Sequence, residues 1–204
     1  MTKKNAGKQA PPKKSLPDLA KDPNWEVRSE VARQGRGKDL DRLVSDPEEN
    51  VREEVAIHGR DQDLDKLVGD KSYMVRAAVA RRQRDQDLDQ LVSDKEWSVR
   101  QVVAQQGRDK DLDRLVSDPV WIVRVAVTKH GRAKDLDKLV NDEDWAVREM
   151  VAKCGRDQDL DLLVHDPYNL VRAAVVAWGR PQDLEILKDD PNPVVQEAVE
   201  KARK

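Results

Sequence analysis

The chain has 204 residues, of which 38% are charged and 38% hydrophobic, and its 38 Lys and Arg residues nearly balance its 40 Asp and Glu residues. A net charge of −2 argues against general affinity for nucleic acid and is too small for charge-driven disorder. The single cysteine, Cys154, excludes an internal disulfide framework and a Cys-rich metal module. No apolar run approaches the roughly 20 residues of a membrane helix, and the first residues lack the apolar core of a signal peptide. We therefore expect an intracellular, cytoplasmic protein.

Residues 1–15 differ in composition from the rest of the chain. They contain Lys3, Lys4, Lys8, Lys13 and Lys14, no acidic residue and a Pro-Pro pair. Without aliphatic periodicity, this segment is predicted to be a disordered basic tail. Two roles stay open for it: a solubilising tail, or an arm that binds nucleic acid or an acidic partner.

Residues 16–204 are built from a 24-residue repeat. The repeats start at residues 16, 40, 64, 88, 112, 136, 160 and 184, and the register never slips. Positions 1 and 4 of the repeat are Leu, position 7 is Asp, and positions 12 and 16 are Val in all eight repeats. Position 13 is Arg except at Gln196, and Arg at position 21 and Asp at position 24 each recur seven times. Such a pattern indicates an array of identical structural units.

Each repeat predicts two short helices. The first, at residues 62–68 across the boundary of the second and third repeats, covers about two turns, with Asp61 as its cap, and is α-helical or partly 3₁₀. The second covers about positions 8–19; the Asp at position 7 is predicted to cap it, and Pro often follows in the first helical position. Glycine at position 20, such as Gly59 and Gly107, is predicted to end this helix, with Gln83 as the exception.

The recurring Arg and Asp residues predict a polar ladder along the array. At 100° per residue, the Arg at position 13 falls inside the apolar arc that the Val residues at positions 12 and 16 form. A half-buried guanidinium needs an acceptor, and the Asp at position 7 of the same or the next repeat is the nearest recurring one. The predicted ladder comprises Asp22, Arg28, Asp46, Arg52, Asp70, Arg76, Asp94, Arg100, Asp118, Arg124, Asp142, Arg148, Asp166 and Arg172. Because these residues recur down the chain, we interpret them as structural and not catalytic.

The unit Leu-Asp-Arg-Leu-Val-Ser-Asp-Pro-x-x-x-Val-Arg-x-x-Val-Ala at residues 40–56 resembles the leucine-rich repeat variant family and, more broadly, HEAT-like repeats. HEAT repeats share an Asp and an Arg six residues apart, which Asp46 and Arg52 match, but a 24-residue unit fits the variant family better. The resemblance covers residues 16–204 and implies a right-handed superhelix of paired short helices. Some members carry a Cys-bound iron–sulfur module before the repeats. No cysteine stands there in this chain, so no cofactor is expected.

A single two-helix unit cannot bury its own apolar face, so stacked neighbours must form a continuous core. We therefore predict an all-α fold, a right-handed α-solenoid of eight two-helix repeats. In the last repeat, Lys188, Gln196 and Glu200 replace Val, Arg and mostly Ala at their repeat positions. These polar changes are typical of a terminal repeat that faces water.

The variable positions of the second helix are where a specific surface can form. Positions 11, 14 and 18 begin polar and become apolar in places. We predict a partner-binding strip that contains Met74, Ile122, Val125 and Leu170, because contiguous exposed apolar side chains often mark interaction sites. The alternative is scattered surface residues or tighter local packing.

Two further recurring positions invite functional interpretations. Position 10 is Trp in four repeats, and an aromatic ladder could stack nucleobases, although packing at the edge of the core is favoured. Position 19 includes His58, His130 and Cys154. Two neighbouring ligands do not make a zinc site, so a structural role at the helix end is favoured and no metal is expected.

No catalytic constellation emerges, because the acid pairs repeat with the period and the glycines stand singly at helix ends. The sequence thus predicts a non-catalytic scaffold that binds a protein partner through the exposed face of its second helices. The alternatives are a nucleic-acid-binding protein or a HEAT-like enzyme, similar to DNA glycosylases or bilin lyases. A nucleic acid partner is weakly supported by the basic tail, and no membrane partner is expected.

Overall fold

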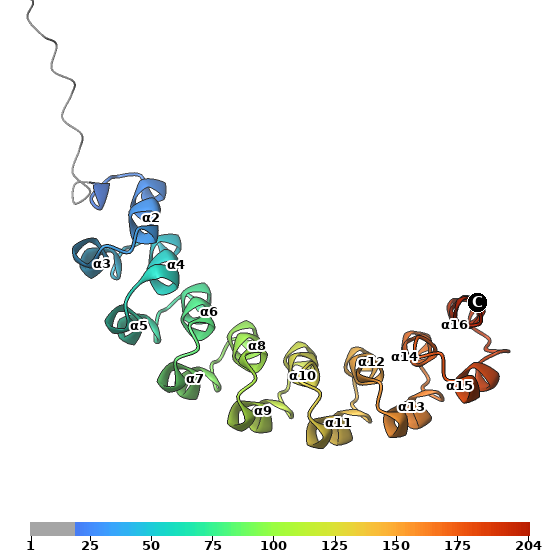
Figure 1. Cartoon of the computed structure of the whole chain (residues 1–204). Coiled ribbons are helices and arrows are strands. Elements are labelled where there is room, and N and C mark those ends of the chain that lie inside the picture. The colour runs from blue at the N-terminus through green and yellow to red at the C-terminus, as the bar shows by residue number, and fades with distance from the viewer. Residues whose placement is uncertain (1–18) are drawn as a thin grey trace, which may run out of the picture. The chain divides into compact units, whose positions relative to one another are not determined.

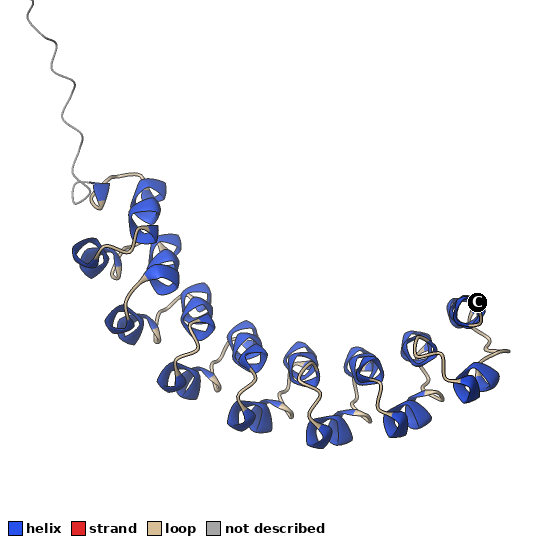
Figure 2. Ribbon diagram, viewed as in Figure 1, coloured by secondary structure: helices blue, strands red, loops and turns tan. Residues whose placement is uncertain are grey.

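The computed structural model describes residues 19–204, and the predicted tail of residues 1–15 lies outside them. The described residues form fifteen helices and no strand (Figures 1 and 2). They fall into two compact units that divide between Arg82 and Gln83, and each unit is described by itself. Within each unit, the second helices of the repeats form one layer and the shorter first helices form another (Figure 1). The predicted all-α solenoid of helix pairs is thereby confirmed.

The helices follow the 24-residue period. In the first unit, the second helices are α2 (Trp25–Arg33), α4 (Glu49–His58) and α6 (Tyr73–Arg81), and the first helices are α3 (Gly37–Leu43) and α5 (Asp61–Leu67). In the second unit, the first helices are α7 (Asp85–Leu91), α9 (Asp109–Leu115), α11 (Ala133–Leu139), α13 (Asp157–Leu163) and α15 (Pro181–Ile186). The second helices there are α8 (Trp97–Gln106), α10 (Trp121–Thr128), α12 (Trp145–Cys154), α14 (Asn169–Val176) and α16 (Pro193–Ala202). None of the described helices has the length and apolar character needed to span a bilayer.

The first helices are α-helical, so the 3₁₀ alternative is wrong for the described repeats. In α9, the N–H of Leu112 donates to the carbonyl of Arg108, and the N–H of Val116 donates to the carbonyl of Leu112, which is the i→i−4 pattern. Bonds of the i→i−3 type occur at the two ends of this helix, where Asp111 donates to Arg108 and residue 118 donates to residue 115. A helix this short is held by its packing and not by its own propensity.

The helix starts differ from the predicted ones. The N-cap of α5 is Arg60 and not Asp61, and the carboxylate of Asp63 at the third helical position accepts the backbone N–H of Arg60 at 2.9 Å. The second helices begin at position 10, two residues later than predicted, so the prolines at position 8 precede the helix. The Asp at position 7 therefore caps the turn before the helix: Asp118 accepts the N–H of Val120, the N-cap residue, at 2.9 Å.

Most second helices end in a left-handed residue at position 20, as the glycines predict. Five of these glycines have φ between 63° and 77°, and Gln83 adopts the same region with φ of 60° despite its side chain. Gly59 is the exception, because it caps α4 with φ of −77°. A Cβ built on Gly59 would lie 2.3 Å from the carbonyl oxygen of Val55, so this close approach, and not a positive φ, favours glycine there.

The core lies between the two layers and is filled by the invariant Leu and Val positions. In the fifth repeat, Leu112, Leu115, Val123 and Val127 are all at most 3% exposed. The helix α10 packs against α8 and α12 in its own layer and against α9 and α11 in the other. Each repeat thus buries its apolar face against its neighbours, and the rows of positions that remain exposed run from repeat to repeat.

The last repeat is polar where the other repeats are buried. Lys188, Gln196 and Glu200 are all exposed. The side chain of Gln196 still donates to the carbonyl of Asp190 at 2.8 Å, as the Arg at this position does in the other repeats. The substitution therefore keeps one contact of the ladder while it removes a buried charge.

Candidate interaction surface

The Arg residues at position 13 bridge consecutive repeats. Arg124 donates through Nε and Nη2 to the two carboxylate oxygens of Asp142 in the next repeat, both at 2.7 Å. Its Nη1 donates to the carbonyl of Asp118 in its own repeat at 2.8 Å. Side-chain exposures of 8% for Arg124 and 6% for Asp142 make this a buried, bidentate pair. The same geometry joins Arg28 to Asp46, Arg52 to Asp70, Arg100 to Asp118, Arg148 to Asp166 and Arg172 to Asp190.

These ion pairs fix the protonation states of their members. The hydrogen bond from Arg172 lowers the pKa of Asp190, against the smaller opposing effect of burial. Burial alone would raise the pKa of Asp70, but the hydrogen bonds from Arg52 and from the N–H of Ser72 lower it overall. Both carboxylates are therefore ionised at neutral pH, and their lone pairs are used inside the fold.

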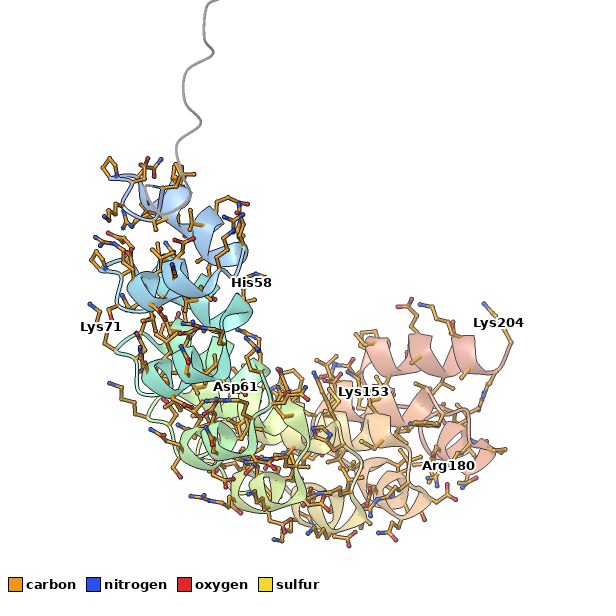
Figure 3. The ribbon with its side chains drawn as sticks, turned by 60° about the vertical axis from the view of Figure 1, so that its left-hand side comes forward. His58, Asp61, Lys71, Lys153, Arg180 and Lys204 are labelled. Atoms are coloured by element: carbon orange, nitrogen blue, oxygen red, sulfur yellow. The ribbon has the colours of Figure 1, made fainter. Side chains whose placement is uncertain are left out.

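A second Arg–Asp ladder, which the sequence analysis did not assign, runs along the first helices. Arg108 donates through Nε and Nη2 to Asp111 at 2.6 and 2.9 Å, and Asp111 is 1% exposed. The same guanidinium also contacts Asp85 at 2.9 Å and Asp89 at 2.8 Å in the preceding repeat. The other Arg residues at position 21 pair in the same way with the Asp three residues later in the sequence. They are Arg60, Arg84, Arg132, Arg156 and Arg180, and Arg180 is labelled in Figure 3. The signal was available, because Arg at 21 and Asp at 24 recur in the sequence at i, i+3 spacing.

The side chains at position 19 reach back to the carbonyls at the end of the preceding second helix. His130 Nε2 lies 2.8 Å from the carbonyl oxygen of Ala104, and Trp178 Nε1 donates to that of Ala152 at 2.9 Å. Burial raises the pKa of the Cys154 thiol, which makes it a poor nucleophile and metal ligand. No cluster of three or more His, Cys, Asp or Glu side chains suited to a metal occurs among residues 19–204. His130 and Trp178 therefore link consecutive second helices.

The predicted strip residues divide between the two units. Ile122 and Val125 lie on α10 and Leu170 lies on α14, with α12 packed between these helices in the second unit. Leu170 is 38% exposed, whereas Ile122 and Val125 are half-buried. Met74 lies on α6 in the first unit and is half-buried. We therefore define the strip as Ile122, Val125 and Leu170, and Met74, which belongs to the other unit, is not part of it.

Aromatic residues border this strip: Trp97, Trp121 and Tyr168 are exposed, and Trp145 is half-buried. Trp97 and Trp121 are the first residues of α8 and α10, and they are 40% and 42% exposed. Trp145 is the first residue of α12, and its ring stacks in parallel on Tyr168 with a centroid distance of 5.0 Å. Partial exposure of this kind is consistent with the predicted packing at the edge of the core, and it leaves part of the Trp97 and Trp121 surface in contact with solvent. We call Trp97, Trp121, Trp145 and Tyr168 the aromatic row.

A second apolar feature, absent from the sequence predictions, lies on the first helices. Leu162 on α13 and Ile186 on α15 occupy position 3, which is polar in the earlier repeats. They are 57% and 48% exposed and border two neighbouring grooves of about 340 and 500 Å³ that share His165 and Pro167. We call Leu162 and Ile186 the edge patch. In the sequence, the edge patch is visible as a change from polar to apolar residues at position 3 of the last two repeats.

Comparison with known proteins identifies the family. No family model matches the sequence, and no curated protein matches it. A solved structure described as a leucine-rich repeat variant with a novel repetitive structural motif is 32% identical, and the match covers 92% of this chain and 80% of that one with a TM-score of 0.76. The chain belongs to the leucine-rich repeat variant family. The structure of YibA from Escherichia coli, at 20% identity and a TM-score of 0.53 over 93% of this chain and 91% of that one, shares the fold.

Proposed function

We propose that this leucine-rich repeat variant protein is a non-catalytic scaffold that binds a protein partner through the exposed face of its second helices. The observation that carries the proposal is the strip of Ile122, Val125 and Leu170, which are apolar at repeat positions that are polar in the first repeat. Leu170 is exposed, and Ile122 and Val125 are half-buried. Neighbouring apolar side chains on the surface of a repeat protein favour protein contact. The cytoplasmic location expected from the sequence is part of the same proposal.

The charge arrangement favours a protein partner over nucleic acid. A nucleic-acid surface needs Lys and Arg side chains that are free to neutralise phosphates. In the second unit, the guanidinium groups at positions 13 and 21 instead contact Asp carboxylates, as Arg124 and Arg132 do at 2.6–2.9 Å. Exposed Lys110 and Lys134 also contact Asp89 and residue 113 at 2.6 Å. These basic groups already have carboxylate partners in the protein, which disfavours phosphate binding at these positions.

The recurrence of the polar residues favours a scaffold over an enzyme. Catalytic groups need a unique arrangement around one reacting centre. The buried carboxylates at position 24, such as Asp111 and Asp135, each accept two hydrogen bonds from an Arg three residues earlier. The same paired arrangement in successive repeats supports a structural role for these carboxylates.

The proposal is tested by comparing two double variants. Partners captured from the native source are identified by mass spectrometry, and each is then tested against Ile122→Asp/Leu170→Asp and against the matched control Leu162→Asp/Ile186→Asp. The strip variant is expected to lose the partner, because each buried contact would be replaced by a desolvated carboxylate. The control has the same chemistry on the edge patch and is expected to keep it. Retention of every partner by the strip variant, or loss only in the control, would refute the strip as the binding surface.

A further inference from the structure

The aromatic row repeats with the spacing of the helices. Trp97, Trp121 and Trp145 stand at the same position of three consecutive repeats, and α8, α10 and α12 pack one against the next. Packed helices lie about 8–10 Å apart, so the rings recur at about this spacing. Because the rings occupy the first position of each helix, they form one line across the helix starts, and Tyr168 extends the line by its stack on Trp145.

The indole N–H groups of the row are available to a ligand. No hydrogen bond from the indole N–H of Trp97, Trp121 or Trp145 to another residue within the described range 19–204 is present, whereas Trp178 donates to the carbonyl of Ala152. An exposed ring with a free donor is a typical recognition element, since the ring gives apolar contact and the N–H takes a carbonyl. The row thus calls for a ligand that offers both apolar surface and free backbone carbonyls.

A polyproline II helix meets both demands at the right spacing. It has three residues per turn and a rise of 3.1 Å, so one face recurs about every 9 Å, close to the distance between packed helices. Its carbonyls carry no internal hydrogen bonds and can accept from the indole N–H groups. An α-helical ligand uses its own carbonyls internally, and a β-strand presents one face about every 7 Å.

The charges beside the row select a basic ligand. Positions 8 and 9, which precede the rings in sequence, hold Glu96, Glu143 and Asp144 against a single base, Lys95, in the fourth to seventh repeats. The side chain of Glu143 is 85% exposed and contacts the ladder through Arg124 at 3.4 Å. A surface with this excess of carboxylates attracts Lys or Arg side chains.

We propose that the aromatic row binds a proline-rich peptide segment of a partner protein in the polyproline II conformation, with Lys or Arg residues between its prolines. The proposal rests on the proposed function, because it names the kind of partner segment that docks beside the strip. Aromatic-lined surfaces favour this conformation, which is already extended before binding and loses little entropy. Trp121, in the middle of the row, is expected to contribute most.

The test uses three synthetic peptides of twelve residues on the full chain, with titration calorimetry as the readout. Four Pro-Pro-Lys units are the ligand, four Gly-Ser-Lys units keep the charge without the polyproline conformation, and four Pro-Pro-Glu units reverse the charge. We expect binding of the Pro-Pro-Lys peptide only. Equal binding of the Gly-Ser-Lys peptide would reduce the interaction to charge, and no binding of Pro-Pro-Lys would overturn the proposal.

Matched variants locate the binding. Trp121→Ala is expected to weaken Pro-Pro-Lys binding at least about tenfold, in the range of an interface hot spot. Trp121→Phe keeps an aromatic ring but removes the N–H and part of the indole surface, and a severalfold loss, smaller than for Trp121→Ala, is expected. Trp25→Ala is the control, since Trp25 has the same repeat position and is 39% exposed, but Glu49 follows it in the next repeat. Equal losses for Trp25→Ala and Trp121→Ala would overturn the assignment.

The two proposals fail in different ways. If the strip variant loses a captured partner but the Pro-Pro-Lys peptide does not bind the unmodified chain, the scaffold function stands and the polyproline inference is wrong. If the peptide binds and Trp121→Ala abolishes it while the strip variant keeps every captured partner, the aromatic row stands and the strip is wrong.

Discussion

Removal of one ladder arginine tests the structural role of the buried ion pairs. Arg124→Met keeps most of the aliphatic stem but removes two bonds of 2.7 Å to Asp142 and one of 2.8 Å to the carbonyl of Asp118. The Asp142 carboxylate is 6% exposed and would keep only the N–H of Asp144. Breaking a buried pair on one side costs about 3–5 kcal/mol. Because both side chains keep a small contact with water, we expect about 3 kcal/mol, the lower end of that range.

Urea unfolding followed by circular dichroism measures this loss. Lys153→Met is the control, because the ion pair of Lys153 (labelled in Figure 3) with Glu149 is largely exposed on the lysine side and should contribute at most about 1 kcal/mol. In the double variant Arg124→Met/Asp142→Asn, the stranded charge is gone, so the loss should be smaller than for Arg124→Met alone. A loss below about 0.5 kcal/mol for Arg124→Met, typical of a surface change, would refute the buried ladder.

Three more predictions concern the core, the helix ends and acid stability. Leu115→Ala should lower the free energy of unfolding by about 2–5 kcal/mol in urea unfolding, because Leu115 is 3% exposed and its loss leaves a cavity. In thermal unfolding, Gly155→Ala should be more destabilising than Gly131→Ala. Both glycines have positive φ, but a Cβ on Gly155 would lie 2.2 Å from the Trp178 ring, whereas a Cβ on Gly131 would have no atom within 4 Å. The difference should vanish when Trp178→Ala is added. The pKa of Asp190 is lowered in the folded protein, so its ionised carboxylate stabilises the fold above the ordinary pKa of 3.8. This stabilisation is lost as the pH falls through the lower pKa of the folded state. The free-energy cost of Asp190→Asn in urea unfolding should therefore decrease in acid, and a cost that does not change with pH would contradict this.

The fold could be predicted almost entirely from the period. Invariant Leu and Val at fixed positions leave one apolar face on each short helix, and a unit of this size has no way to bury that face except against its neighbours. The helix starts were less predictable. Asp61 and Asp63 both stand near the start of α5, and propensity alone cannot tell that the second, three residues after Arg60, accepts the capping N–H.

The ladders show where sequence pattern stops. The helical period places Arg124 inside the apolar arc, but two Asp residues of equal type, Asp118 and Asp142, compete for it. In the structure, Asp118 in the same repeat supplies a backbone carbonyl to Arg124, and Asp142 in the next repeat supplies the carboxylate. The second ladder does not follow from the sequence pattern alone, because the burial of Arg108 and Asp111 depends on the packing of successive repeats.

The exposed surface was predicted only in part, because exposure depends on neighbouring repeats. Ile122 and Leu170 stand out in the sequence as apolar residues at polar positions. The exposure of Trp121 could not be derived from its repeat position, since that position lies at the boundary between the buried and solvent-facing sides of the helix. The stacking of Trp145 on Tyr168 could not be derived either, because the two residues occupy different positions of adjacent repeats.

Site-specific cross-linking tests the partner-binding surface most directly. A photoreactive benzoylphenylalanine is introduced in place of Ile122 on the strip and, in a second protein, in place of Leu162 on the edge patch, and each is irradiated with the captured partner. The proposed surface predicts a covalent adduct to the partner from position 122 and none from position 162. An adduct from position 162 alone would contradict the claim that the second-helix face binds the partner.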